Sequence, residues 1–99
     1  MASLAEIVSF LDRELNTAGI PDYSGAMNGL QLENSSGKVE RIIAAVDASL
    51  PVIEAAAAGG PGLLLVHHGM FWQGTQPLKG AFFKKIKTAM DAGLAIYSS

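Results

Sequence analysis

The stretch around the chain's two histidines limits most strongly the folds that this sequence can adopt. An apolar run, Leu63–Val66, leads directly into His67 and His68 and is preceded by Pro61 and Gly62. A short apolar run bounded in this way is typical of a strand buried on both faces, as in parallel sheets. In open α/β sheets, ligands bind beyond the carboxyl ends of such strands. The sequence therefore places both histidines at the edge of the sheet where a ligand-binding site is expected.

The rest of the chain alternates between helix and strand patterns. Helical spacing of apolar residues predicts helices near 4–17, 50–58 and 81–92, and β-rich runs predict strands near 39–46, 63–66 and 94–98. A short alternating run at 29–33 predicts a half-exposed strand. A strand, a helix and a strand within about thirty residues form a βαβ unit with parallel strands. We therefore expect an α/β fold, with residues 1–99 forming a single domain whose mostly parallel sheet is flanked by helices.

Local chemistry marks the helix ends. Ser3 followed by Glu6 matches a capping box, and Pro51 stands in the first turn of the second predicted helix, where its missing N–H is harmless. The glycine-rich segment 59–62 follows a helix and precedes a strand. A phosphate-binding loop needs the opposite order, so this segment is interpreted as a helix stop.

Composition narrows the class of protein. Hydrophobic residues make up 49% of the chain and charged residues 16%, which excludes a disordered tail and predicts an apolar surface that meets a partner or a second domain. The net charge of -2 argues against a nucleic-acid partner. Cysteine is absent from the sequence, which excludes disulfides and thiolate metal sites. With charged residues in the first predicted helix, we expect neither a signal peptide nor a membrane span, and a cytoplasmic protein.

His67 and His68 are the candidate metal ligands. Neutral imidazole is the commonest side-chain ligand, but adjacent residues in a regular strand point to opposite faces. At a strand end, with Gly69 freeing the backbone, both rings can lean over the sheet edge and serve two neighbouring ions. The alternative is a pair of ordinary strand-end histidines, one packed and one exposed.

Other polar residues admit two interpretations each. Asp47, at the end of the neighbouring strand, either orients or joins the histidine site, or belongs to the start of the next helix. Asn28, Gln31 and Glu33 lie near the turn predicted at Asn28-Gly29 and either face a site or, for Asn28, serve turn chemistry alone.

Three further segments are weighed in the same way. The basic residues of the third predicted helix are expected on a solvated face: Lys84, Lys85 and Lys87. The segment 70–72 (Met-Phe-Trp) forms either a pocket lid, a partner surface or core. Ser98 and Ser99 have no adjacent acid or histidine in the sequence that would make a nucleophile.

Three stretches together resemble the Nif-three-like family, whose members are often named type-two GTP cyclohydrolase I homologues. They are 22–33 with its Asn-Gly-Leu-Gln element, 44–49 (Ala-Ala-Val-Asp-Ala-Ser) and 65–71 with the two histidines. The terminal segment 95–98 (Ala-Ile-Tyr-Ser) resembles that family too, so the resemblance covers nearly the whole chain. Its most specific piece is the histidine pair after an apolar strand.

The resemblance implies a site for two divalent metal ions, of the zinc, iron or manganese class, in which His67 and His68 match the family's paired ligands. It implies a metal-dependent hydrolase of GTP cyclohydrolase type acting on a small molecule, in homo-oligomers that are commonly hexameric. The family's remaining ligands follow the strand that 94–98 matches, so we expect this sequence to be the N-terminal portion of a longer fold. The alternative function is a non-catalytic interaction or regulatory protein.

These interpretations make a geometric prediction. His67 and His68 should lie side by side at the carboxyl edge of the sheet. The strand 94–98 should lie beside the histidine strand, and Ser99 should then point towards the histidines.

Overall fold

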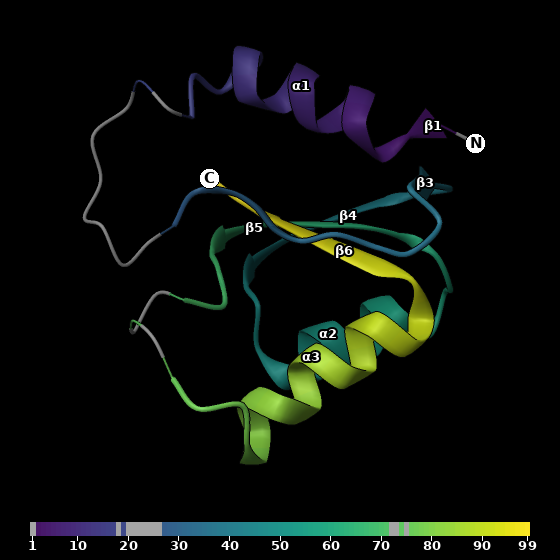
Figure 1. Ribbon diagram of the computed structural model, residues 1–99, viewed down its shortest axis with the longest axis vertical. Helices are drawn as coiled ribbons and strands as arrows, with labels where there is room; N and C mark the ends of the chain where they lie inside the picture. Colours follow the sequence, from purple (N-terminus) through teal and green to yellow (C-terminus); the bar gives the residue numbers. More distant parts are fainter. Residues whose placement is uncertain (1, 18, 20–26, 72–73, 75) are drawn as a thin grey trace.

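A four-stranded sheet lies between two layers of helices (Figure 1). Helix α1 (Leu4–Glu14) covers one face, and α2 (Leu50–Ala57) and α3 (Gly80–Ala92) cover the other. The structure is a computed structural model that describes residues 2–17, 19, 27–71, 74 and 76–99. The predicted α/β class with a helix-flanked sheet is confirmed.

The strand order in this sheet is β2–β6–β5–β4. Strands β4 (Ile42–Asp47), β5 (Gly62–His68) and β6 (Leu94–Ser98) are mutually parallel, and β2 (Gly29–Leu32) pairs antiparallel with β6. Helices α2 and α3 are the crossovers of two successive βαβ units, as the sequence predicted for the first. The carboxyl ends of the three parallel strands therefore meet at one edge of the sheet.

The strand predicted at 39–46 is two strands. Strand β3 (Lys38–Val39) pairs antiparallel with a short β1 (Ala2–Ser3) in a separate two-stranded sheet, and β4 begins only at Ile42. The chain redirects between them at Arg41, whose guanidinium donates to the carbonyl oxygens of Ala56, Gly59 and Gly60 at the end of α2. A cation on the last carbonyls of a helix is favourable. This contact ties the segment before β4 to the end of α2.

Two boundaries also differ from the prediction. Helix α1 ends at Glu14 rather than near residue 17. Strand β5 continues through both histidines instead of stopping at Val66, because Asp47 of β4 still pairs with His68. On the other side of β5, the Ser99 amide donates to the Val66 carbonyl. The ladder is therefore longer than the apolar run that marks it.

The predicted cap at Ser3 is present, and the start of α2 and the end of α3 are capped as well. The Ser3 hydroxyl accepts from the Glu6 amide at 3.4 Å, and the Ser49 hydroxyl accepts from the Val52 amide at 3.4 Å. Helix α3 ends at Gly93, whose φ of 72° lies in the left-handed region that favours glycine.

The alternation of side chains along β5 and β6 divides the core in two. Leu64, Val66 and Ile96 are buried on the α2–α3 face, whereas Leu63 and Tyr97 are buried against α1. Both faces of the central strands are therefore apolar, which explains the continuous run that the sequence shows. Each large aliphatic side chain buried in this way contributes about 1.5–3 kcal/mol to the free energy of unfolding.

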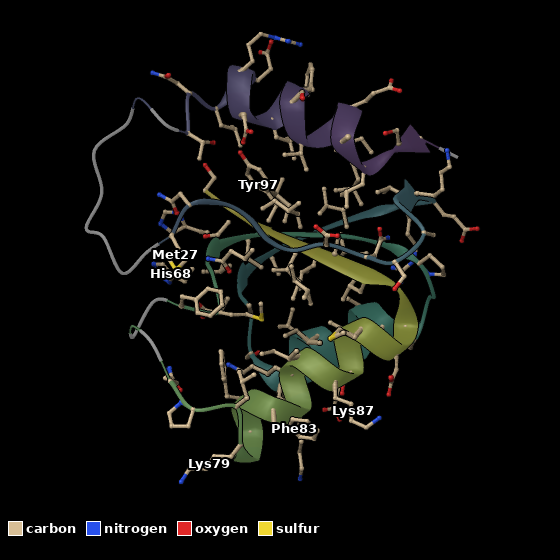
Figure 2. The ribbon with its side chains drawn as sticks, in the orientation of Figure 1. Met27, His68, Lys79, Phe83, Lys87 and Tyr97 are labelled. Atoms are coloured by element: carbon tan, nitrogen blue, oxygen red, sulfur yellow. The ribbon has the colours of Figure 1, made fainter. Side chains whose placement is uncertain are left out.

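Tyr97 joins the sheet to α1. Its side chain points from β6 towards the helix (Figure 2), where its hydroxyl donates to Asp12 Oδ1 at 2.6 Å and lies 2.6 Å from Thr17 Oγ1. Burial, followed by the hydrogen bond to Asp12, raises the pKa of Tyr97 to about 12. This contact spans most of the chain and locks α1 in place.

Strand β4 lies at the edge of the four-stranded sheet. Ile42 and Val46 on its α1 side are 53% and 64% exposed, because the core cluster beneath α1 contains side chains of β5 and β6 but none of β4. No helix in the part of the chain that the structure describes is long and apolar enough to cross a membrane.

Candidate functional site

His67 and His68 lie side by side where β5 ends. Their ring centroids are 4.6 Å apart, and the ring planes are inclined by 37°. His67 is exposed, and the side chain of His68 is 37% exposed. The predicted side-by-side arrangement at the carboxyl edge is therefore confirmed. In the interior of a regular strand, adjacent side chains would instead point to opposite faces of the sheet.

Each histidine ring is held through Nδ1. His68 Nδ1 lies 2.9 Å from Asp47 Oδ1, and His67 Nδ1 lies 3.1 Å from the Ser99 carbonyl oxygen. A carboxylate and a carbonyl only accept hydrogen bonds, so each neutral ring carries its proton on Nδ1 and its lone pair on Nε2. This is the arrangement in which histidines coordinate metals through Nε2, with an oxygen orienting the ring.

The structure decides between the two interpretations of Asp47. Ser49, rather than Asp47, is the residue whose side chain caps α2. The Asp47 carboxylate is turned to His68, its register partner on the neighbouring strand. Asp47 is therefore a positioning residue for His68.

Ser99 also lies where the sequence predicted. Strand β6 pairs with β5 in parallel, with Ser98 opposite Val66, so the chain leaves the sheet beside the histidines. The hydrogen bond between the Ser99 carbonyl and His67 follows from this register. Ser98 is buried, and its hydroxyl donates to the His67 carbonyl at 3.4 Å, which is a structural role.

Gln31 supports the segment that follows the histidines. Its Oε1 accepts from the Met70 amide at 2.8 Å, and its Nε2 donates to the Met27 carbonyl at 3.1 Å. A Cβ atom at Gly69 would overlap this amide group, so the glycine leaves the space that Gln31 occupies. The sequence predicts that Gly69 frees the backbone. The structure shows instead that this position must be glycine so that the Gln31 amide can approach closely.

The other two polar residues near the turn differ from each other. Asn28 Oδ1 lies 3.4 Å from the Ser98 hydroxyl oxygen, so Asn28 lies at the edge that carries the histidines. Glu33 follows Leu32, which pairs with Ile96, and therefore lies towards the opposite end of β6. The interpretation of Glu33 as a site residue is wrong. Because β2 runs antiparallel to β6, its carboxyl end points away from the edge that carries the site.

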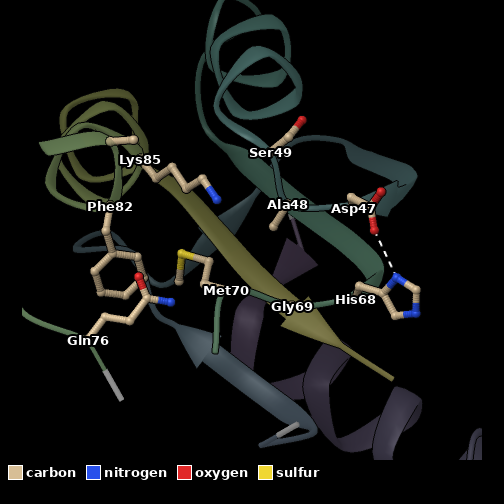
Figure 3. Close-up of a pocket in the computed structure, with 10 residues that line it drawn as sticks. Asp47, Ala48, Ser49, His68, Gly69, Met70, Gln76, Phe82 and Lys85 are labelled. Atoms are coloured by element: carbon tan, nitrogen blue, oxygen red, sulfur yellow. Dashed lines mark hydrogen bonds and ion pairs between the residues drawn. The ribbon is translucent and has the colours of Figure 1, made fainter. Parts of the chain in front are cut away.

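A pocket of about 460 Å³ adjoins His68 (Figure 3). Buried Met70 and Phe82 supply its apolar wall, and Phe71 packs edge-on against Phe82 with centroids 5.9 Å apart. Of the three interpretations of the segment 70–72, core packing therefore holds for Met70 and Phe71. Trp72 lies outside the described residues.

Lys85 also lines this pocket, which corrects the expectation of a uniformly solvated lysine face. Lys84 is exposed, and Lys87 forms an ion pair with Asp91 at 2.6 Å, but Lys85 is half-buried. Lys85 follows Phe82 by three residues and so shares its side of α3. The spacing puts Lys85 on the side of Phe82, but the pocket on that side is a feature of the tertiary structure.

The described residues do not by themselves form a metal site. Within residues 2–17, 19, 27–71, 74 and 76–99, no three His, Cys, Asp or Glu side chains are arranged to hold an ion. Among the described residues, the imidazoles of His67 and His68 are the nitrogen donors at this edge, and Asp47 is hydrogen-bonded to His68. A divalent ion fits these donors chemically, with further positions left to other groups.

The fold and this edge define a class: α/β proteins that present adjoining, oxygen-oriented histidines at the carboxyl end of a central parallel strand. The model of the Duf34/NIF3 (NGG1p interacting factor 3) family matches residues 2–99, and the chain belongs to this family. The resemblance to the Nif-three-like family is thereby confirmed.

Curated relatives carry the name GTP cyclohydrolase 1 type 2 homolog. The Deinococcus radiodurans protein is 40% identical over 94 residues, and the Pyrococcus abyssi protein is 45% identical over 92 residues. These alignments cover 95% and 93% of this chain but only 35% and 36% of the relatives. The chain thus spans about a third of the length of the proteins it matches.

Solved structures show the same fold. TTHA1606 from Thermus thermophilus superimposes with a TM-score of 0.90 at 31% identity, covering 99% of this chain and 40% of that protein. Reduced HcgD from Methanocaldococcus jannaschii gives a TM-score of 0.80 at 27% identity, covering 99% and 39%.

Proposed function

We propose that this chain supplies the paired-histidine part of a divalent-metal site in a metal-dependent hydrolase of GTP cyclohydrolase type. The observation that carries the proposal is the geometry of His67 and His68, which lie together at the sheet edge with both Nδ1 atoms held by oxygens. The names of the curated relatives support the reaction type.

The residues of this chain would act by fixing the ligands. Asp47 and the Ser99 carbonyl hold the two rings through Nδ1, so that Nε2 of each would be the coordinating atom. The family resemblance makes zinc, iron and manganese the candidate metals, and imidazole is a ligand that suits zinc and iron. A bound divalent ion would supply an activated water and would polarise a carbonyl or phosphoryl oxygen.

A second candidate function is a non-catalytic interaction or regulatory protein that retains the fold. Two observations favour it. The described residues offer no group of three metal ligands, and exposed Ile42 and Val46 leave one face of β4 apolar. Such a protein would be isolated without metal and in a stable complex, either with copies of itself or with another protein.

Metal loading separates the two functions. The protein is incubated in turn with Zn²⁺, Mn²⁺ and anaerobic Fe²⁺, and the metal retained after gel filtration is measured by mass spectrometry. We expect weak retention by two imidazoles, which the His67→Ala and His68→Ala substitutions abolish while the thermal unfolding midpoint changes little. Retention that survives the double substitution would refute the assigned ligands.

A further inference from the structure

We propose that the pocket beside His68 binds the phosphate group of a small-molecule phosphate ester, with Lys85 as the phosphate-binding residue. The inference deepens the proposed function, on which it rests, by naming the residue and the pocket that bind the phosphate. It depends on four observations: a half-buried lysine, an apolar wall, the position of the histidine, and a volume that suits a small molecule.

Lys85 differs from the other lysines of α3. Figure 3 shows its ammonium directed across the pocket towards the segment that carries Ala48 and Ser49. Among the described residues, no carboxylate forms an ion pair with it, whereas Lys87 is paired with Asp91. Partial burial of an unpaired ammonium costs solvation free energy, and an incoming anion offsets that cost.

The remaining walls define the rest of the ligand. Met70 and Phe82, only 5% and 7% exposed, form an apolar surface, and the Gln76 amide lies at the rim. The volume of about 460 Å³ lies within the range of about 300–1,000 Å³ typical of small-molecule sites. A ligand of this size can place an apolar or aromatic body against Met70 and Phe82 while its anionic group reaches Lys85.

The charges in the pocket are separated in space. Lys85 and the Asp47–His68 pair lie on opposite sides of the pocket in Figure 3. The Asp47 carboxylate lies next to His68. It therefore repels an anion most strongly at that end of the pocket. The phosphate would therefore bind at the Lys85 side, and the other end of the ligand would extend towards His68.

A phosphate fits this site better than a carboxylate. A lysine ammonium binds phosphate as a compact point charge, and a phosphate monoester carries more negative charge than a carboxylate near neutral pH. The start of α2 faces the same pocket through Ser49 and adds positive potential. Its capping hydroxyl already accepts from Val52, so Lys85 carries the main interaction.

The test is a titration of the chelator-treated protein with phenyl phosphate, followed by amide chemical shifts in nitrogen–proton correlation spectra. We expect shifts at Ala48, Ser49 and Gly69. Lys85→Met should weaken binding about tenfold, the loss of one charge-assisted hydrogen bond. Lys85→Arg should largely restore it. Lys84→Met, which removes the same charge from an exposed position, is the matched control and should leave binding unchanged.

Three results would overturn the inference. Equal weakening by Lys84→Met and Lys85→Met would show a non-specific charge effect. Shifts that avoid the pocket would place the ligand elsewhere, and benzoate binding as tightly as phenyl phosphate would refute the phosphate assignment. Because metal is absent from this titration, failure of the histidine site to bind metal would refute the proposed function without altering these outcomes.

Discussion

Asp47 and His68 face each other across the carboxyl ends of β4 and β5: they are register partners, and Oδ1 of Asp47 lies 2.9 Å from Nδ1 of His68. The same strand ends are joined by the Ala48 amide, which donates to the His68 carbonyl at 3.1 Å. The orientation of the imidazole is therefore coupled directly to strand pairing, so a shift in register would remove the ring from its carboxylate.

Removing the Asp47 carboxylate should weaken metal binding more than it weakens the fold. Asp47→Ala leaves the His68 ring without its orienting oxygen, and loss of such a partner lowers metal affinity about 10–100-fold. The pair is partly exposed, so its contribution to the free energy of unfolding is at most about 1 kcal/mol. Competition with a chromogenic chelator measures the affinity.

Glu40→Ala serves as the control, because Glu40 is an exposed carboxylate that precedes β4. Equal metal affinity in Asp47→Ala and Glu40→Ala would show that Asp47 does not position the ligand.

Gly69 and Gln31 should be coupled in a double-mutant cycle. Gly69→Ala displaces the Gln31 amide, with loss of its bonds to Met70 and Met27, and should cost about 1–2 kcal/mol. In a Gln31→Ala background the new methyl group meets no amide, so the same substitution should cost less. Urea unfolding of the four proteins gives the coupling energy. Additive costs would mean that the overlap is relieved by backbone movement.

Tyr97 should make the protein lose stability at alkaline pH. Its pKa is raised to about 12 in the folded protein from 10.0, so the folded state holds this proton more tightly than the unfolded state. The associated stability is fully present below pH 10 and is lost as the pH rises from about 10 towards 12. Urea unfolding at a series of pH values measures the slope.

Tyr97→Phe is the matched variant for this pH effect. It removes the hydroxyl that bonds to Asp12 and Thr17, at a cost of about 1 kcal/mol or more near neutral pH. The remaining loss of stability between pH 10 and 12 should then be shallower than in the parent protein. An identical slope in both proteins would assign the alkaline loss to other groups.

Exposed apolar side chains should drive the protein to associate with itself. Val46 and Ile42 on edge strand β4 are 64% and 53% exposed, and burying them against a second copy removes apolar surface from water. Val46→Lys should therefore lower the average mass measured by light scattering, since charge on an edge strand opposes pairing. Lys38→Ala, an exposed change on another strand, is the control. Unchanged mass in Val46→Lys would exclude this face.

The histidine strand was predictable because its signal is local. A run buried on both faces must be apolar at every position, so Leu63–Val66 identified a central parallel strand without any knowledge of its neighbours. The helix starts were predictable for the same reason, since Ser3 bonds three residues along its own chain. The limits of β4 and β5 were not, because pairing partners extend or interrupt a strand beyond its own apolar pattern.

The sequence by itself thus determined the α/β class, the first βαβ crossover and the position of His67 and His68 at a strand end. Only the tertiary structure decided that Asp47 serves His68 rather than α2, and that Lys85 enters a pocket while Lys84 stays in solvent. These contacts join residues far apart in the chain. Strand register and the packing angle of α3 set them, and neither quantity is encoded in the local spacing of residue types.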